Sequence, residues 1–386
     1  MSRITTLIFA ACAVAGAGHA PIVAAQDAAA APKAAATAPA KKAAAAKAAG
    51  EKKPETAAAP AEDEAFKLFR RDLINLLALS GDARKQIAAA QFAAPDQKDS
   101  TRSAVKKTPA LVKRALELGP QDPLVLWIAA SNACLDKPGC ADPAALKTLQ
   151  GIDADNTAVW LLSWPADDNA GMQRASVMRM AQTQRYNDYW GTDVAALYRA
   201  LEILPVPKEI VALGLSSESA RINFATSIAS AFLPVPLQRL HQFCTTLDAA
   251  KDEAAVADCI AVARKLEAGG TFVAQGIGFA IEEALLQPGV DKDVMGARRR
   301  SAAWQKEKFM ELSGRFSREP ALAQAYVDAL EKEPDASAAL ITFLRGQKQH
   351  TDPPGDWQPA PPPKAADALT SPAPAPSPPP PPAAQP

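Results

Sequence analysis

The chain has 386 residues, of which 48% are hydrophobic by type and only 6% aromatic, and its 42 basic side chains balance 42 acidic ones. This balance argues against a nucleic-acid-binding protein, because phosphate contacts normally require a clear excess of basic residues. Alanine supplies 19 of the 37 residues from 26 to 62, and 15 of the 34 prolines lie in the last 36 residues. Neither end can build a core, whereas the middle of the chain is long enough to bury a substantial one.

The first 25 residues have the features of a secretory signal peptide: a positive charge at Arg3, then an apolar stretch from Ile4 to about Ala17. This stretch is too short to cross a bilayer, and no other segment is long and apolar enough to do so. An alternative is lipid attachment at Cys12, which the short apolar run before this residue disfavours. We therefore expect a mature protein without a transmembrane segment that is periplasmic or secreted.

Three further regions follow the predicted signal peptide. Residues 26–62 are rich in Ala, Lys and Pro, and the prolines interrupt any helix, so we expect a disordered linker. Residues 351–386 form a proline-rich tail in which consecutive prolines favour extended polyproline II geometry. Residues 63–350 are the expected folded domain.

Helical periodicity recurs through this domain, and no alternating strand pattern appears, so we predict an all-α fold. The first two helices, 63–79 and 83–92, are separated by a Gly-Asp turn and predict a helical hairpin. Further helices are predicted at 101–118, 123–134, 143–149, 157–163, 168–182, 192–203, 218–232, 235–247, 251–268, 271–286, 294–312, 319–332 and 337–345.

One junction pattern occurs three times: LELGPQDPLVLW at 116–127, LQGIDADNTAVW at 149–160 and, more faintly, LEKEPDASAALI at 330–341. In each, a turn with Pro or Asp separates a closing helix from a new one. The pattern resembles the junctions of tetratricopeptide repeats, with Trp127 and Trp160 in the family's opening tryptophan position. After Trp127, the usual Leu, Gly and Tyr are replaced.

This resemblance implies stacked antiparallel helical hairpins, a tetratricopeptide-like α-solenoid with disordered ends. The layout is also similar to exported helical proteins of Gram-negative bacteria. That likeness implies a location and a fold, and no activity.

The mature chain carries four cysteines: Cys134, Cys140, Cys244 and Cys259. An even number in an exported protein indicates disulfides, and we expect sequence neighbours to pair. A bridge between Cys244 and Cys259 across a hairpin would stabilise the fold by about 3 kcal/mol. The alternatives are reduced core thiols, or a metal site that includes His241 beside Cys244.

Two short motifs resemble those of enzymes. Ser103 and Lys106 have the S-x-x-K spacing of penicillin-recognising enzymes, but the companion motifs of those enzymes are missing. Gly276 and Gly278 resemble a dinucleotide-binding loop, but Ile281 stands where the third glycine belongs. We expect these two glycines to allow two helices to approach closely.

Titratable residues give no clear catalytic set. Glu282 and Glu283 are a candidate acid pair for cell-wall hydrolysis, but neighbours on a helix do not face each other, so a solvated helix edge is the default. The two histidines of the mature chain, His241 and His350, have no recognisable catalytic partner in the sequence. We expect no cofactor.

Two groups of residues are candidates for a binding surface. Tyr186, Asp188 and Tyr189 lie in a Tyr-rich stretch at a helix start and are either core residues or a contact surface. The run Arg298, Arg299 and Arg300 is either a solvated helix face or a site for anionic lipid or a carboxylate-bearing partner.

From the sequence we therefore expect an exported helical scaffold that contacts another protein or an envelope component. A helical cell-envelope hydrolase that uses an acidic residue is the alternative, and a purely structural spacer is a third possibility.

Overall fold

The computed structural model describes residues 60–93, 102–132, 142–167, 169–211, 216–231, 236–248, 251–333 and 335–359. Within these ranges the chain is mostly helical and forms no β-strand, which confirms the predicted all-α class for this part. The predicted signal peptide, all but the last residues of the predicted linker, and the tail after Pro359 lie outside the described residues.

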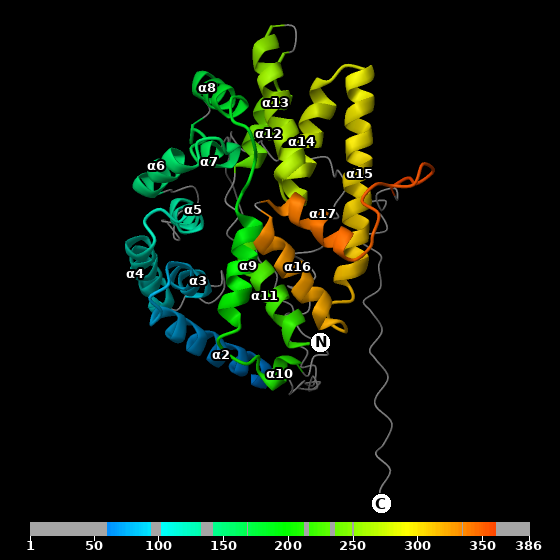
Figure 1. Ribbon diagram of the computed structural model, residues 1–386. Coiled ribbons are helices and arrows are strands. Elements are labelled where there is room, and N and C mark those ends of the chain that lie inside the picture. The colour runs from blue at the N-terminus through cyan, green and yellow to red at the C-terminus, as the bar shows by residue number, and fades with distance from the viewer. Residues whose placement is uncertain are drawn as a thin grey trace, which may run out of the picture. The chain divides into compact units, whose positions relative to one another are not determined.

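The helices of the first half are α2 (Pro60–Ala78), α3 (Ala83–Ala93), α4 (Arg102–Leu118), α5 (Pro123–Asn132), α6 (Pro143–Ile152), α7 (Thr157–Leu161) and α8 (Ala170–Ala181). Each of them contacts the next one along the chain, and Figure 1 shows them following one another along one side of the molecule.

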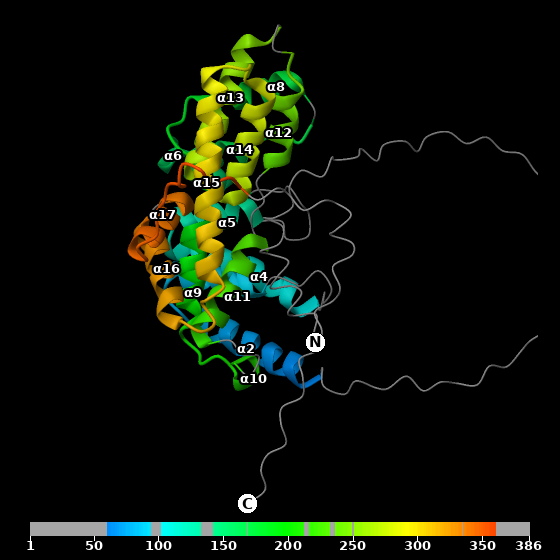
Figure 2. The ribbon, with the colours of Figure 1, turned by 90° about the vertical axis from the view of Figure 1, so that its right-hand side faces the viewer.

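The second half contains α9 (Trp190–Leu201), α10 (Lys208–Val211), α11 (Ser217–Ala231), α12 (Leu237–Thr245), α13 (Glu253–Gly269), α14 (Phe272–Leu285), α15 (Val290–Ser313), α16 (Pro320–Lys332) and α17 (Ala336–Gly346). Helix α9 packs against α3, α11 and α16, whereas α13 packs against α8 and α14. Figure 2 shows the long helix α15 running past α14 and α17, both of which it contacts.

The three repeated junctions of the sequence are three similar helix starts. The carboxylate of Asp122 accepts a hydrogen bond from the Leu124 amide at 2.9 Å, and Asp335 accepts one from the amide of Ala338 at 2.7 Å. At the middle junction, the side chain of Asn156 accepts from the amide of Ala158 at 3.1 Å. Each side chain satisfies an amide that the first helical turn leaves without a partner, which is why the helix begins there.

Most predicted helices agree with the observed bounds within a few residues. The sequence did not predict α10, a single turn that lies between Pro207 and the start of α11. A helix of four residues is too short to show an apolar periodicity, so the pattern carried no signal for it.

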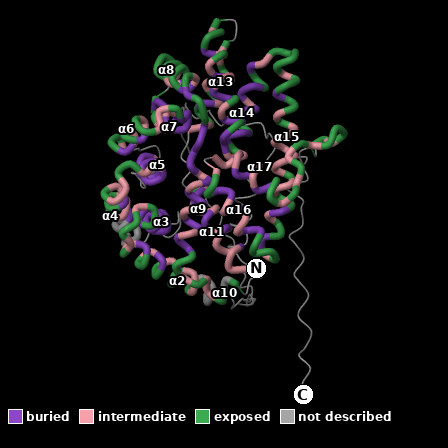
Figure 3. Tube along the Cα trace, viewed as in Figure 1, coloured by how far each residue is buried: buried purple, intermediate pink, exposed green. Residues whose placement is uncertain are grey.

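The core consists of two hydrophobic clusters. The first is formed by α3 to α8 with α12 to α14 and includes Trp127. The second is formed by α2, α3, α9, α11 and α15 to α17, and it includes Tyr198 and Phe343. Helix α3 contributes Ile87 to the first cluster and Phe92 to the second, so it joins the two. Figure 3 shows the contrast between the buried helices α5 and α9 and the largely accessible α15.

A disulfide links α12 to α13. Cys244 and Cys259 are bonded, with their Cα atoms 5.8 Å apart, and both are fully buried in the first cluster. This confirms the predicted pairing of these two residues. It also rules out the metal site on His241 and Cys244, because the sulfur of Cys244 is no longer a thiolate. Cys134 and Cys140 lie outside the described residues.

No helix in the described ranges combines the length and the apolar character needed to span a membrane.

Gly278 lets α13 and α14 pack closely, as the sequence predicted, whereas the same prediction is wrong for Gly276. A Cβ atom at Gly278 would lie 2.6 Å from the carbonyl oxygen of Ala263 and 2.9 Å from the Cγ atom of Glu267. Both distances are shorter than a carbon atom tolerates, so only glycine fits here. Gly276, on the same helix, is exposed, and a Cβ atom added there would meet no neighbour within 4 Å.

We therefore expect substitution by alanine to have opposite effects on the stability of the protein at these two positions. We expect Gly278→Ala to lower the free energy of unfolding by about 1–3 kcal/mol, because α13 and α14 must move apart. We expect Gly276→Ala to raise it by about 0.5–1 kcal/mol, because alanine favours the helix and nothing is displaced. Urea unfolding of both variants, followed by circular dichroism, measures the difference; equal effects would contradict the close approach.

Candidate functional site

The Tyr-rich stretch before α9 belongs to the core. The side chains of Tyr186, Asp188 and Tyr189 are only 1%, 3% and 6% exposed. The interpretation of these residues as an exposed binding surface is therefore wrong, and the alternative interpretation as core residues holds. The reason is tertiary: a Cβ atom at Gly269 would lie 2.1 Å from the Tyr186 carbonyl oxygen, so the turn between α13 and α14 closes over this segment.

Hydrogen bonds from the residues at the start of α7 also hold the segment before α9. The amide of Thr157 donates to the carbonyl oxygen of Arg185 at 2.8 Å, and the side chain of Asn156 bonds both the amide and the carbonyl oxygen of Asn187 at 2.8 Å. The hydroxyl of Tyr189 donates to Asp153, which also forms an ion pair with Arg185. Tyr189 itself has a left-handed backbone, with φ of 56°, a strained conformation that these contacts enforce.

Burial raises the pKa of Asp188 to about 6, against hydrogen bonds that favour its charged form, the first of them from the Trp190 amide. The carboxylate of Asp188 accepts hydrogen bonds from the Trp190 amide at 3.2 Å and from the Tyr186 hydroxyl at 3.4 Å, so it is bound within the core beside the start of α9.

The three consecutive arginines of α15 point to three different partners. Arg298 pairs with Glu267 at 2.8 Å and with Glu282, while Arg299 pairs with Glu283 at 3.3 Å. Arg300 donates to the carbonyl oxygens of Pro354 and Gly355. Arg298 and Arg300 are therefore engaged within the chain, whereas Arg299 is exposed with its partner Glu283, as the solvated helix face predicts.

Glu282 and Glu283 have different environments. Glu282 is fully buried and accepts hydrogen bonds from Arg264 at 2.8 Å and from Arg298, so the predicted solvated edge is wrong for this residue. Glu283 is accessible and pairs with Arg299 and, at 3.2 Å, with Lys292. As the helix geometry indicated, the two carboxylates do not face a common substrate site.

The residue that faces Glu282 is Glu267, on α13, which the sequence did not single out. Burial, followed by the hydrogen bond to Glu282, raises the pKa of Glu267 to about 7, whereas Arg298 opposes the rise. The cluster of Glu267, Glu282, Arg264 and Arg298 thus ties α13, α14 and α15 together. The helix-period spacing of Arg264 and Glu267 is the only sequence signal for it, and this spacing is common on solvated helix faces.

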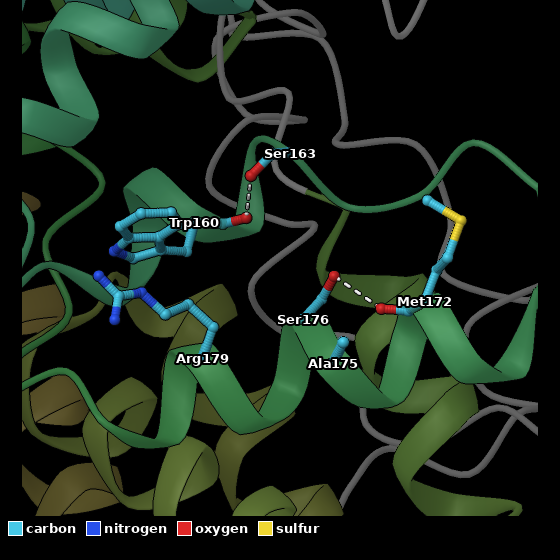
Figure 4. A pocket seen from close by; sticks show the side chains of 6 residues that line it. All are labelled: Trp160, Ser163, Met172, Ala175, Ser176 and Arg179. Atoms are coloured by element: carbon cyan, nitrogen blue, oxygen red, sulfur yellow. Dashed lines mark hydrogen bonds between the residues drawn. The ribbon is translucent and has the colours of Figure 1, made fainter.

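An accessible groove lies between α7 and α8 (Figure 4). It has a volume of about 290 Å³ and is lined by Trp160, Ser163, Met172, Ala175, Ser176 and Arg179. The guanidinium carbon of Arg179 lies 4.3 Å from the centre of the Trp160 ring, a cation–π contact. The indole nitrogen of Trp160 donates to the Ala154 carbonyl oxygen at 2.7 Å, which fixes the orientation of the ring.

The walls of this groove are mainly apolar. The hydroxyl of Ser176 donates to the Met172 carbonyl oxygen at 3.0 Å, and that of Ser163 donates to Trp160 at 2.8 Å, so both are satisfied locally. Met172 is 53% exposed. The guanidinium of Arg179 lies over the Trp160 ring at one end of the groove (Figure 4). The sequence indicated Trp160 only as a repeat position.

Comparisons with protein-family models, with curated proteins and with solved structures give no match to this chain. Its function must therefore be inferred from its own geometry.

The arginine cluster predicts different effects for two neighbouring residues. We expect Arg298→Ala to lower the free energy of unfolding by about 2–4 kcal/mol, because it leaves Glu267 and part of Glu282 buried without compensation. We expect Arg299→Ala, the matched control, to change it by less than about 0.5 kcal/mol, because its pair with Glu283 is accessible to solvent. Thermal and urea unfolding at pH 7.5 compare the two; a small effect of Arg298→Ala would contradict the structural role.

Another buried carboxyl group, that of Asp193, predicts a pH dependence of stability. Asp193, on α9, accepts one hydrogen bond from the Gln91 side chain at 2.8 Å, and its other oxygen has no partner in the described structure. Burial raises the pKa of Asp193 to about 7. The native state therefore holds a proton that the unfolded chain loses near pH 4, so this group's contribution to stability falls as the pH rises from about 4 to 7.

We expect Asp193→Asn to remove that fall. The variant should be more stable than the parent at pH 8 by about 1–3 kcal/mol and similar to it at pH 4. The exposed Asp72→Asn is the control and should leave the pH profile of the unfolding midpoint unchanged. A parallel offset of the Asp193→Asn profile at every pH would contradict a proton on Asp193.

Proposed function

We propose that this protein is an exported helical scaffold that binds a protein partner through the groove between α7 and α8. The succession of contacts from α2 to α8, with capped helix starts at the repeated junctions, supports stacking of helical hairpins in the manner of tetratricopeptide repeats. Such stacks present surfaces to partners and need no catalytic residue.

The observation that carries this proposal is the groove itself. Trp160 offers a large rigid face, and exposed Met172 offers an adaptable apolar side chain, both of which are typical of protein contact sites. Arg179 adds a positive charge at the end of the groove. The chemistry that fits is a peptide segment with an apolar side chain next to a carboxylate.

The disulfide between α12 and α13 supports the proposed location outside the cytoplasm. Cys244 and Cys259 are fully buried and bonded, and structural disulfides persist in oxidising compartments such as the periplasm or the exterior. This agrees with export by the predicted signal peptide.

The hydrolase alternative has less support. Glu282 has no exposed surface, so in this conformation a substrate cannot reach its oxygen atoms. Both it and Glu283 form ion pairs with arginine and do not face a common substrate site.

Photo-crosslinking tests the groove. A photoreactive side chain in place of Met172, which lines the groove, should give a discrete adduct with a protein in cells, and Arg179→Ala in the same chain should abolish it. The matched control carries the photoreactive side chain in place of Met178, an equally exposed methionine of α8 outside the groove. The proposal fails if both positions give the same adducts, or if the adduct at 172 persists without Arg179.

A further inference from the structure

The segment after α17 returns to α15 and lies along it. The indole nitrogen of Trp304 donates to the carbonyl oxygen of His350 at 2.8 Å. The side-chain amide of Gln305 donates to the carbonyl oxygen of Thr351 at 3.1 Å. Residues 351–359, the start of the predicted disordered tail, thus belong to the same compact unit as the helices, so the predicted boundary at residue 351 is wrong. We call residues 350–357 the strap.

The strap is also held at its far end. Arg300 donates to the carbonyl oxygens of Pro354, at 2.7 Å, and Gly355, at 3.1 Å. The ring of Trp357 packs edge-on against that of Trp304, with the ring centres 5.3 Å apart. Arg300, Trp304 and Gln305, which we call the α15 face, therefore contact the strap near both of its ends.

The four hydrogen bonds named above between this face and the strap each run from an α15 side chain to a backbone carbonyl oxygen. Pro353 and Pro354 have no amide to donate, and residues 354–357 form a turn closed by a hydrogen bond from the Trp357 amide to the Pro354 carbonyl oxygen at 3.1 Å. Proteins recognise proline-containing peptides with aromatic rings and side-chain donors, and this face supplies both. The face is thus chemically suited to a proline-containing segment that turns and ends in an aromatic residue.

The strap is weakly buried in the chain that carries it. Asp352, Pro354, Gly355 and Asp356 are exposed, and Trp357 is half-buried. Lys348, with φ of 56°, belongs to the C-terminal cap of α17, where the amides of Lys348 and Gln349 donate to the carbonyl oxygens of Arg345 and Leu344, each at 2.9 Å. The strap begins after this cap, so its release would expose little apolar area and would leave α17 intact, which favours exchange of identical segments between copies.

We propose that α15 carries a peptide-binding site for a proline-containing segment, that the strap fills this site in its own chain, and that the site accepts the strap of a second copy. The proposal rests on α15 and the strap alone and is independent of the groove between α7 and α8.

A synthetic peptide with the sequence of residues 349–359 tests the site in the full-length protein. Trp357→Ala weakens the strap without changing α15, so this variant should bind the labelled peptide at least tenfold more tightly than the parent in fluorescence anisotropy. Adding Trp304→Ala to it should abolish binding. If the peptide binds neither the parent nor Trp357→Ala, the α15 face is not a separable binding site and the proposal is overturned.

Complementation tests exchange between copies. Trp357→Ala has an intact site and a defective strap, whereas Arg300→Ala has a defective site and an intact strap. We expect a mixture of the two to form heterodimers in sedimentation velocity, while each alone remains at the parent's sedimentation coefficient. Arg299 pairs with Glu283 and not with the strap, so Arg299→Ala is the matched control for Arg300→Ala. Mixed with Trp357→Ala, it should form at least tenfold fewer heterodimers than Arg300→Ala does. A mixture that sediments as the sum of its components would overturn the exchange.

Discussion

The close contact between Tyr186 and the turn at Gly269 and Gly270 is the constraint on which the rest of the structure depends. Only residues without a Cβ atom allow this turn to approach the Tyr186 backbone, and the carbonyl oxygen of Gly270 also accepts a hydrogen bond from Ser337 at 3.1 Å. The turn therefore connects the start of α9 with α17. A side chain at Gly269 would separate the helices that make the two hydrophobic clusters.

Arginines that seemed available in the sequence are used inside the fold. Arg298 pairs with two buried carboxyl groups, Arg300 holds the strap, and Arg199 pairs with Glu331 at 2.6 Å and with Asp328. Such interactions align the helices that they join. The two surfaces with features of recognition are the groove, where the Arg179 charge lies on an indole ring, and the α15 face, where three side chains bind backbone carbonyls.

Much of the helical layout could be predicted from the sequence, because caps and apolar periodicity act within a few residues. Asp122, Asn156 and Asp335 begin helices where the repeated junctions indicated, and the close approach at Gly278 was also expected. The site was predicted less well: Tyr186 and Tyr189 proved to be core residues, and Glu282 proved to be buried. Local pattern cannot distinguish a polar residue on a solvated face from one that meets a charged partner on another helix.

The sequence by itself determined where the helices begin and end, which helix can approach its neighbour, and that Cys244 can bond Cys259. These properties depend on interactions between residues close along the chain. Only the tertiary structure decided that Glu267 faces Glu282, that Arg179 lies over Trp160, and that the start of the proline-rich tail lies on α15. Those contacts join residues on different helices or beyond a helix end, and their pairing is fixed by how the elements pack, which no local periodicity encodes.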